Sequence, residues 1–215
     1  MIQKRLTILL LFLATLPCIK TEAQGIDYDI LWNLQQQRTP TMSKVMEWTS
    51  NSLILAPCVP AGLLVSGALA DNQQLVYIGT ATGISFLTAF TVTEALKYTI
   101  RRPRPYITHS MTLTPVKTTI GYSFPSGHTS LTFATATSLS LSCRKWYVVA
   151  PSMLWASGVA FSRLYLGVHY PSDVLTGMAV GVLSGFAGYW LSQKICDEAD
   201  IPPAKILIPP ITLRF

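Results

Sequence analysis

The chain has 215 residues, of which 50% are hydrophobic and only 12% are charged, and its formal net charge is +6. Because a soluble domain usually carries about 25% charged residues, this deficit indicates a membrane protein and excludes an ordinary soluble domain. A nucleic-acid partner is excluded as the reason for the positive charge, because basic residues gather in or beside one loop, residues 97–117, between apolar segments.

The first 23 residues have the organisation of a secretory signal. Lys4 and Arg5 precede a short apolar run, residues 6–16, and a small-residue pattern ends at Ala23. We expect cleavage after Ala23, with an uncleaved N-terminal anchor as the alternative. In both cases the chain continues on the outer side of the inner membrane.

Residues 24–50 are too polar to cross a membrane and are expected to form a periplasmic, interfacial helical segment. Asp27 is expected to cap a short helix that ends at Gln37. Thr39 is expected to cap the next helix, with Pro40 at its first position. The second helix has apolar and charged residues typical of a helix at the membrane interface, and a loose linker is the alternative.

Five apolar segments follow, each close to the ~20 helical residues that a hydrocarbon core requires. They are residues 52–70, 75–97, 126–142, 146–163 and 172–194. The predicted fold is therefore an all-α, polytopic membrane helix bundle with interfacial helices. It has five spans after a cleaved signal peptide, or six if the N-terminal segment is retained. Residues 51–195 form the transmembrane domain, and residues 196–215, with two Pro-Pro pairs, form an extended tail.

Small residues mark the surfaces on which these spans are expected to pack. The third span is short and rich in Ser, Thr and Ala, and the fifth carries glycines at positions 177, 181, 185 and 188. Such residues allow membrane helices to approach closely.

Counting the spans from an external N-terminus predicts the topology. The turn at Arg144-Lys145 falls inside, in agreement with the positive-inside rule. The loop that begins at Lys97 and the segment around His169 fall outside. The basic residues of the outer loop oppose the rule, so we expect them to bind a small, highly charged anion at the membrane surface.

Three ordered blocks of polar residues lie at the outer ends of the spans. They read KxxxxxxRP, PSGH and SRxxxxxHxxxD, and contain Lys97, Arg104, Ser126, Gly127, His128, Arg163, His169 and Asp173. A helix that begins at Ser126 directs unpaired N–H groups and its positive dipole end towards an anion. Lys and Arg side chains bind phosphate oxygens, and ionisable groups this near hydrocarbon are costly and mark function.

These blocks resemble the three motifs of the type 2 phosphatidic acid phosphatase superfamily. The resemblance implies a membrane-embedded phosphatase that hydrolyses lipid phosphate mono- or diesters or pyrophosphates through a phosphohistidine. By resemblance, His169 is the nucleophile, Asp173 orients its ring, and His128 protonates the leaving oxygen and then activates water. The residues expected to bind the phosphate are Lys97, Arg104, Ser126, Gly127 and Arg163.

No cofactor or metal is expected, because Lys and Arg supply the positive charge and no carboxylate cluster is present to hold magnesium. The four cysteines have no CxxC spacing, so zinc and a disulfide framework are also unexpected.

The expected partners are membrane lipids and the substrate, with no nucleic acid and no obligate protein partner. Compatible substrates are undecaprenyl diphosphate, phosphatidylglycerol phosphate, phosphatidic acid and lipid A phosphates. The expected location is the bacterial inner membrane, with the active site facing the periplasm.

Three other functions are compatible with parts of the pattern. A vanadate-dependent haloperoxidase shares the site layout by family, and a catalytically idle membrane module or a soluble periplasmic acid phosphatase are further alternatives.

Glu94 is expected to form a structural ion pair with Lys97. His109, Arg101 and Arg102 lie outside the motif positions and are kept as candidate contacts to the substrate head group.

Overall fold

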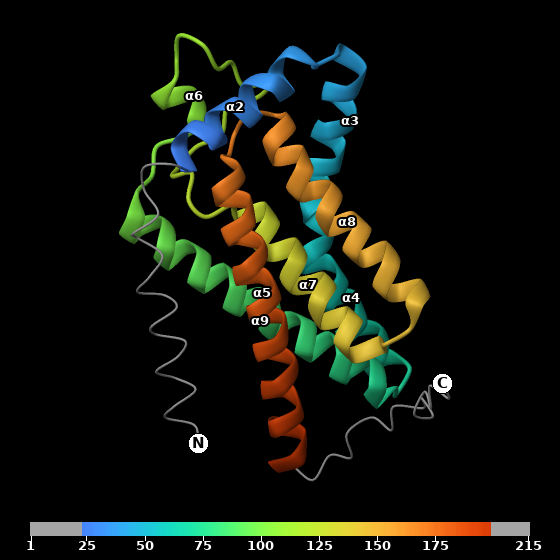
Figure 1. Cartoon of the computed structure of the whole chain (residues 1–215). Coiled ribbons are helices and arrows are strands. Elements are labelled where there is room, and N and C mark those ends of the chain that lie inside the picture. The colour runs from blue at the N-terminus through green and yellow to red at the C-terminus, as the bar shows by residue number, and fades with distance from the viewer. Residues whose placement is uncertain (1–22, 199–215) are drawn as a thin grey trace, which may run out of the picture.

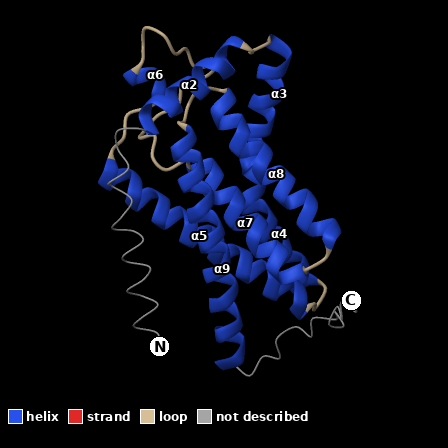
Figure 2. Cartoon of the chain, viewed as in Figure 1, coloured by secondary structure: helices blue, strands red, loops and turns tan. Residues whose placement is uncertain are grey.

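The structure is a computed structural model that describes residues 23–198. Every regular element in this range is a helix, as Figure 2 shows, so the all-α prediction is confirmed for the described part. The expected signal segment, apart from Ala23, and the tail beyond residue 198 lie outside the described residues. Residues 196–198, expected to begin an extended tail, are instead the last residues of a helix.

Two helices precede the main bundle, α2 (Ala23–Gln36) and α3 (Pro40–Asn51). Thr39 caps α3 as predicted, since its side chain accepts a hydrogen bond from the N–H of Met42 at 3.2 Å. The prediction for Asp27 is wrong, because α2 already begins at Ala23 and Asp27 lies inside it. The helical conformation of α3 excludes a loose linker, and α3 continues without a break through η2 (Ser52–Ile54) into the next helix.

Five longer helices form the bundle, and they correspond to the five expected spans. They are α4 (Leu55–Leu69), α5 (Gln73–Ile100), α7 (Gly127–Cys143), α8 (Trp146–Tyr165) and α9 (Pro171–Glu198). Three described segments are long and apolar enough to cross a membrane: Pro40–Leu69, Gln73–Thr108 and Pro171–Ile195. The number of five spans therefore stays a prediction for α7 and α8.

Helix α7 lies at the centre of the bundle, where it packs against α5, α8 and α9 (Figure 1). Its Ser, Thr and Ala side chains are buried, and hydroxyls inside the helix bond backbone carbonyls; Thr132 Oγ1, for example, donates to the carbonyl of His128 at 2.9 Å. Most hydroxyls of this helix are satisfied, although those of Thr137 and Ser142 have no partner among residues 23–198. Small side chains let three helices surround one. This burial explains why α7 is less apolar than a lipid-exposed span.

The glycines of α9 form the predicted packing stripe. A Cβ atom added at Gly181 would lie 2.7 Å from the Cβ of Phe133, and one added at Gly185 would lie 2.6 Å from the Cβ of Thr137. Both neighbours belong to α7. One added at Gly188 would lie 2.6 Å from the backbone N of Ser85 on α5. The glycines thus set how closely α9 approaches both helices.

One end of the bundle carries α2, the short helix α6 (Pro105–Thr108) and the loops that connect the longer helices (Figure 1). Helix α2 and the residues just after it are tied to these loops by polar contacts. Gln35 accepts from the N–H of Thr114 at 2.7 Å, and Arg38 Nε donates to the carbonyl of Tyr165 at 2.8 Å. These contacts fix the loop after α6 and the end of α8 relative to each other.

We predict that Gly181→Ala lowers stability while Gly62→Ala does not. The added methyl group at Gly181 meets Phe133 and the backbone of Ala134, whereas nothing lies within 4 Å of a Cβ at Gly62. Overpacking typically costs about 1–3 kcal/mol, and Gly→Ala at an open helix position gains up to about 1 kcal/mol. Thermal unfolding in detergent measures both, and an unchanged midpoint for Gly181→Ala would contradict the packing assigned to the stripe.

Candidate active site

The residues of the three sequence blocks converge at the loop-bearing end of the bundle. Arg104 precedes α6, Arg163 lies in the last turn of α8, His169 lies between α8 and α9, and Asp173 lies in the first turn of α9. These four side chains are buried, with exposed fractions of 4%, 4%, 2% and 0% in the same order. Residues far apart in sequence therefore form one polar cluster inside the protein.

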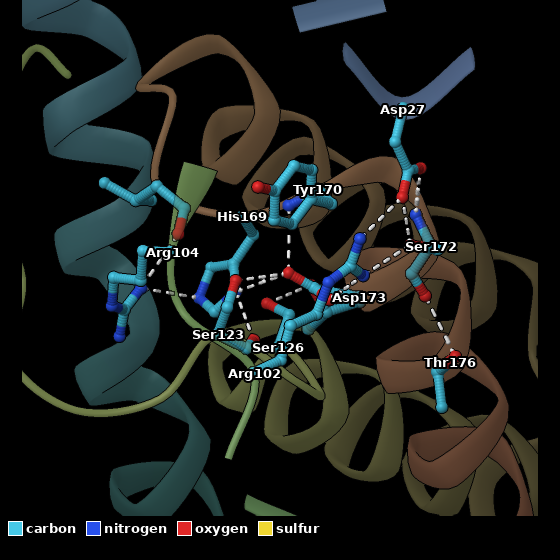
Figure 3. Close-up of polar contacts among 12 residues, drawn as sticks. Asp27, Arg102, Arg104, Ser123, Ser126, His169, Tyr170, Ser172, Asp173 and Thr176 are labelled. Atoms are coloured by element: carbon cyan, nitrogen blue, oxygen red, sulfur yellow. Dashed lines mark hydrogen bonds and ion pairs between the residues drawn. The ribbon is translucent and has the colours of Figure 1, made fainter. Parts of the chain in front are cut away.

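The ring of His169 has one nitrogen held by the backbone and the other directed at a cation. Nδ1 lies 2.7 Å from the carbonyl oxygen of Ser123, and because a carbonyl only accepts, Nδ1 carries the proton. Nε2 then keeps its lone pair and lies 3.3 Å from Nη1 of Arg104 (Figure 3). Burial lowers the pKa of His169 to about 4, against the opposing effect of Asp173. The ring is therefore neutral at neutral pH, with Nε2 available as a nucleophile.

Asp173 reaches this ring through Ser123. Its Oδ2 accepts from the Ser123 hydroxyl and from the N–H of Tyr170 at 2.9 Å. Its Oδ1 accepts from Nη1 of Arg102 at 2.7 Å. The carboxylate is 3.6 Å from His169 Nδ1, too far for a strong hydrogen bond. Ser123, which sequence analysis did not single out, therefore connects the carboxylate to the ring.

Arg104 and Arg163 supply positive charge beside His169. Arg104 donates to three backbone carbonyls at 2.9–3.0 Å, those of Gly121, Val168 and Ile120. These contacts hold the loop before α7 next to the segment before His169. Arg163 donates through Nη1 to the hydroxyl of Ser50, and its buried Nε has no hydrogen-bond partner among residues 23–198. This N–H is thus available to an anion.

The N-terminus of α7 faces Lys97. The N–H of Ser126 donates to the carbonyl of Asp173 at 3.0 Å, which joins the helix start to α9. A Cβ atom added at Gly127 would lie 3.2 Å from Lys97 Nζ, so the missing side chain gives the ammonium its close approach. Lys97 also pairs with Glu94 at 2.9 Å, which confirms the predicted ion pair.

His128 completes the cluster from the first turn of α7. It is partly buried, and it lies close enough to the other groups for their charges to act on it: Arg163, His169, Lys97 and Arg104. The structure therefore brings together all eight residues that the sequence motifs predict. Two imidazoles face a set of cations and a helix N-terminus, an arrangement suited to binding and transferring a phosphoryl group. Among residues 23–198, no three His, Cys, Asp or Glu side chains are grouped to hold a metal ion.

The candidate head-group contacts outside the motif positions have other partners. Arg102 donates to Asp173 and to Asp27, so its charge is paired inside the protein. The ring of His109 lies 4.8 Å from that of Tyr28, in an aromatic contact. Arg101 caps the C-terminus of α5 in a left-handed conformation. The pairing of Arg102 with Asp27 could not be predicted from local sequence, because the two residues are 75 positions apart.

Comparison with known proteins gives matches to one family. The model of the PAP2 superfamily matches residues 74–196. The chain is 36% identical over 144 residues to an undecaprenyl-diphosphatase from Sulfolobus acidocaldarius, covering 66% of each chain. It is 36% identical over 88 residues to a lipid A 4'-phosphatase from Bacteroides thetaiotaomicron, covering 40% of this chain and 39% of the relative. Each alignment spans less than two thirds of the relative's length.

A solved structure has the same arrangement of helices. The crystal structure of a transmembrane PAP2 type phosphatidylglycerolphosphate phosphatase from Bacillus subtilis superposes with a TM-score of 0.66. The superposition covers 88% of this chain and 96% of that one, at 28% identity. Together with the candidate spans, this similarity identifies a multi-pass membrane protein.

We predict that His169 titrates near pH 4 and not near 6.5. A His whose pKa is lowered in the folded protein stays neutral as the pH falls, and it gains its proton only near the lowered value. The ¹⁵N signals of labelled histidine, assigned by their loss in His169→Ala, should keep the positions of a neutral ring from pH 8 to about pH 5. A midpoint near 6.5 would show that the ring is not buried as described.

Proposed function

Because the chain belongs to the PAP2 superfamily, we propose that it is a membrane-embedded phosphatase that removes phosphate from a lipid phosphate or diphosphate. The observation that carries this proposal is the convergence of His169 and His128 with three cations. Relatives named as a diphosphatase and as a lipid A phosphatase support the substrate class. A haloperoxidase or an idle membrane module has no observation that favours it.

The first step transfers the phosphoryl group to the protein. Nε2 of His169 attacks phosphorus, a bond forms between nitrogen and phosphorus, and the bond from phosphorus to the lipid oxygen breaks. His128 gives its proton to that leaving oxygen. The attacking ring becomes positively charged, and the Asp173 carboxylate nearby stabilises this charge.

The second step restores the free enzyme. His128, now without its proton, takes one from water, and the resulting hydroxide attacks the phosphorus. The bond between phosphorus and His169 breaks, and inorganic phosphate leaves with the oxygen taken from water. Lys97, Arg104 and Arg163, with the Ser126 hydroxyl and the N–H of Gly127, balance the charge on the phosphoryl oxygens in both steps.

We expect the site to face the outer leaflet of this membrane, where lipid head groups lie. This orientation, in a bacterial inner membrane with the site facing the periplasm, follows from the expected topology with Arg144-Lys145 inside. The site residues support phosphoryl transfer, but neither they nor superfamily membership define the head group. The substrate is tested by phosphate release from four lipids: undecaprenyl diphosphate, phosphatidylglycerol phosphate, phosphatidic acid and lipid A. Release from none of them would overturn the proposal.

Substitution of each histidine separates the two roles. His169→Ala should abolish turnover and leave no covalent phosphate. His128→Ala should slow both steps, by about 10²–10⁴-fold. An aryl phosphate, whose leaving group needs little protonation, should restore the first step in His128→Ala, so that phosphoenzyme accumulates. Acid-quench trapping of labelled phosphate measures this. Label in His169→Ala and none in His128→Ala would reverse the assignment.

A cysteine at position 118 tests the orientation. Thr118 is exposed in the loop before α7. In a cysteine-free background, Thr118→Cys should react with an impermeant thiol reagent in cells whose outer membrane alone has been opened. Reaction that requires disruption of the inner membrane would place the site on the cytoplasmic side.

A further inference from the structure

One guanidinium lies between two buried carboxylates beside the site. Arg102 donates through Nη1 to Asp173 at 2.7 Å and through Nη2 to Asp27 at 3.0 Å. Asp173 has no exposed surface and Asp27 is 4% exposed. A buried carboxylate that loses its partner is strongly destabilised, so the three side chains fix one another's positions (Figure 3).

Neighbouring groups hold this guanidinium in one plane. Its central carbon lies 3.9 Å from the centre of the Tyr170 ring, and Nη1 also donates to the hydroxyl of Ser172 at 2.7 Å. Asp27 accepts from the N–H of Ser172 at 3.0 Å and from its hydroxyl. Asp27 therefore caps the first turn of α9 and, with the same carboxylate, orients Arg102.

The position of Asp173 affects the orientation of the His169 ring through Ser123. The Ser123 hydroxyl donates to Asp173, and the Ser123 carbonyl accepts from His169 Nδ1 at 2.7 Å. If the carboxylate turned, Ser123 would shift, and the ring would lose the acceptor that keeps the proton on Nδ1. The lone pair on Nε2 depends on this tautomer.

We propose that Asp27 is a positioning residue for the reaction and acts through Arg102. Arg102 holds the carboxylate of Asp173, and that carboxylate holds the reactive tautomer of His169 by way of Ser123. The inference rests on the proposed function, in which His169 attacks phosphorus. Asp27 belongs to α2, outside the residues 74–196 that the family model matches, so α2 contributes to the site.

Charge gives Asp27 a second effect on the same ring. Two carboxylates and one guanidinium carry a net charge of −1, which balances the positive charge that His169 gains on attack. With Asn at position 27 the remaining pair is neutral, and this balance is lost. The effect falls on the step at phosphorus, since none of these groups is in the set assigned to phosphate binding.

A double-mutant cycle tests the coupling. Arg102→Met should lower kcat by about 10–100-fold, the range found when the outer-shell partner of a metal-binding His is lost. Asp27→Asn should lower it by a smaller factor, with KM unchanged in both. In the Arg102→Met background, Asp27→Asn should lower kcat by a smaller factor than in the wild type, because the part of its effect that passes through the guanidinium is already lost. Asp29→Asn, at an exposed position of the same helix, is the matched control and should equal the wild type.

Labelled histidine gives a readout that does not need activity. The ¹⁵N signals of His169 should show a loss of the Nδ1–H tautomer in Asp27→Asn and Arg102→Met, and none in Asp29→Asn. Multiplicative effects on kcat, or unchanged signals, would mean that Asp27 only caps α9.

If Arg102→Met fails to fold, Arg102→Lys replaces it in the cycle. Lysine keeps the charge but reaches only one carboxylate. A wild type that cleaves none of the four lipids would refute the proposed function, while the signals would still decide the role of Asp27.

Discussion

The burial of one carboxylate organises the loop-bearing end of this protein. Asp173 is fully buried, and a buried charge must be paired and hydrogen-bonded. The donors to its carboxylate come from three places: Arg102 after α5, Ser123 before α7, and the backbone N–H of Tyr170 between α8 and α9. Satisfying this charge brings together the chain segments that carry the reactive groups.

Helix packing and site geometry are linked through α9. Gly177 lies one turn after Asp173, and a Cβ added there would lie 3.2 Å from the Cβ of Thr129 on α7. This close approach at the start of α7 lets the N–H of Ser126 reach the Asp173 carbonyl. A bulkier α9 surface would separate the N-terminus of α7 from the carboxylate, so small residues are needed for chemistry as well as packing.

Patterns with a fixed spacing were predictable, and contacts across the fold were not. The segment from residue 126 to residue 142 predicted α7 within a residue at each end, and ordered motifs predicted the set around His169. Asp27 was misassigned as the cap of its own helix, because its partner Ser172 at the start of α9 lies 145 positions away. Ser123 was missed because it contacts the ring through its backbone carbonyl. Every residue has a backbone carbonyl, so this contact cannot be predicted from the residue type. Arg102 was expected to be a candidate head-group contact, because its ion pairs with Asp27 and Asp173 cannot be predicted from the sequence.

The concentration of cations has a thermodynamic consequence for the whole protein. Arg104 and Arg163 are each 4% exposed, and the charge of Arg104 acts on Arg163. Lys97 lies beside Gly127 at the start of α7. Like charges in a low-dielectric setting repel, so folding works against this repulsion. An anion bound between them relieves it, and by linkage such an anion stabilises the folded state. Inorganic phosphate has the same chemistry as the phosphoryl group, so the product of the proposed reaction would protect the enzyme against unfolding while it slows turnover.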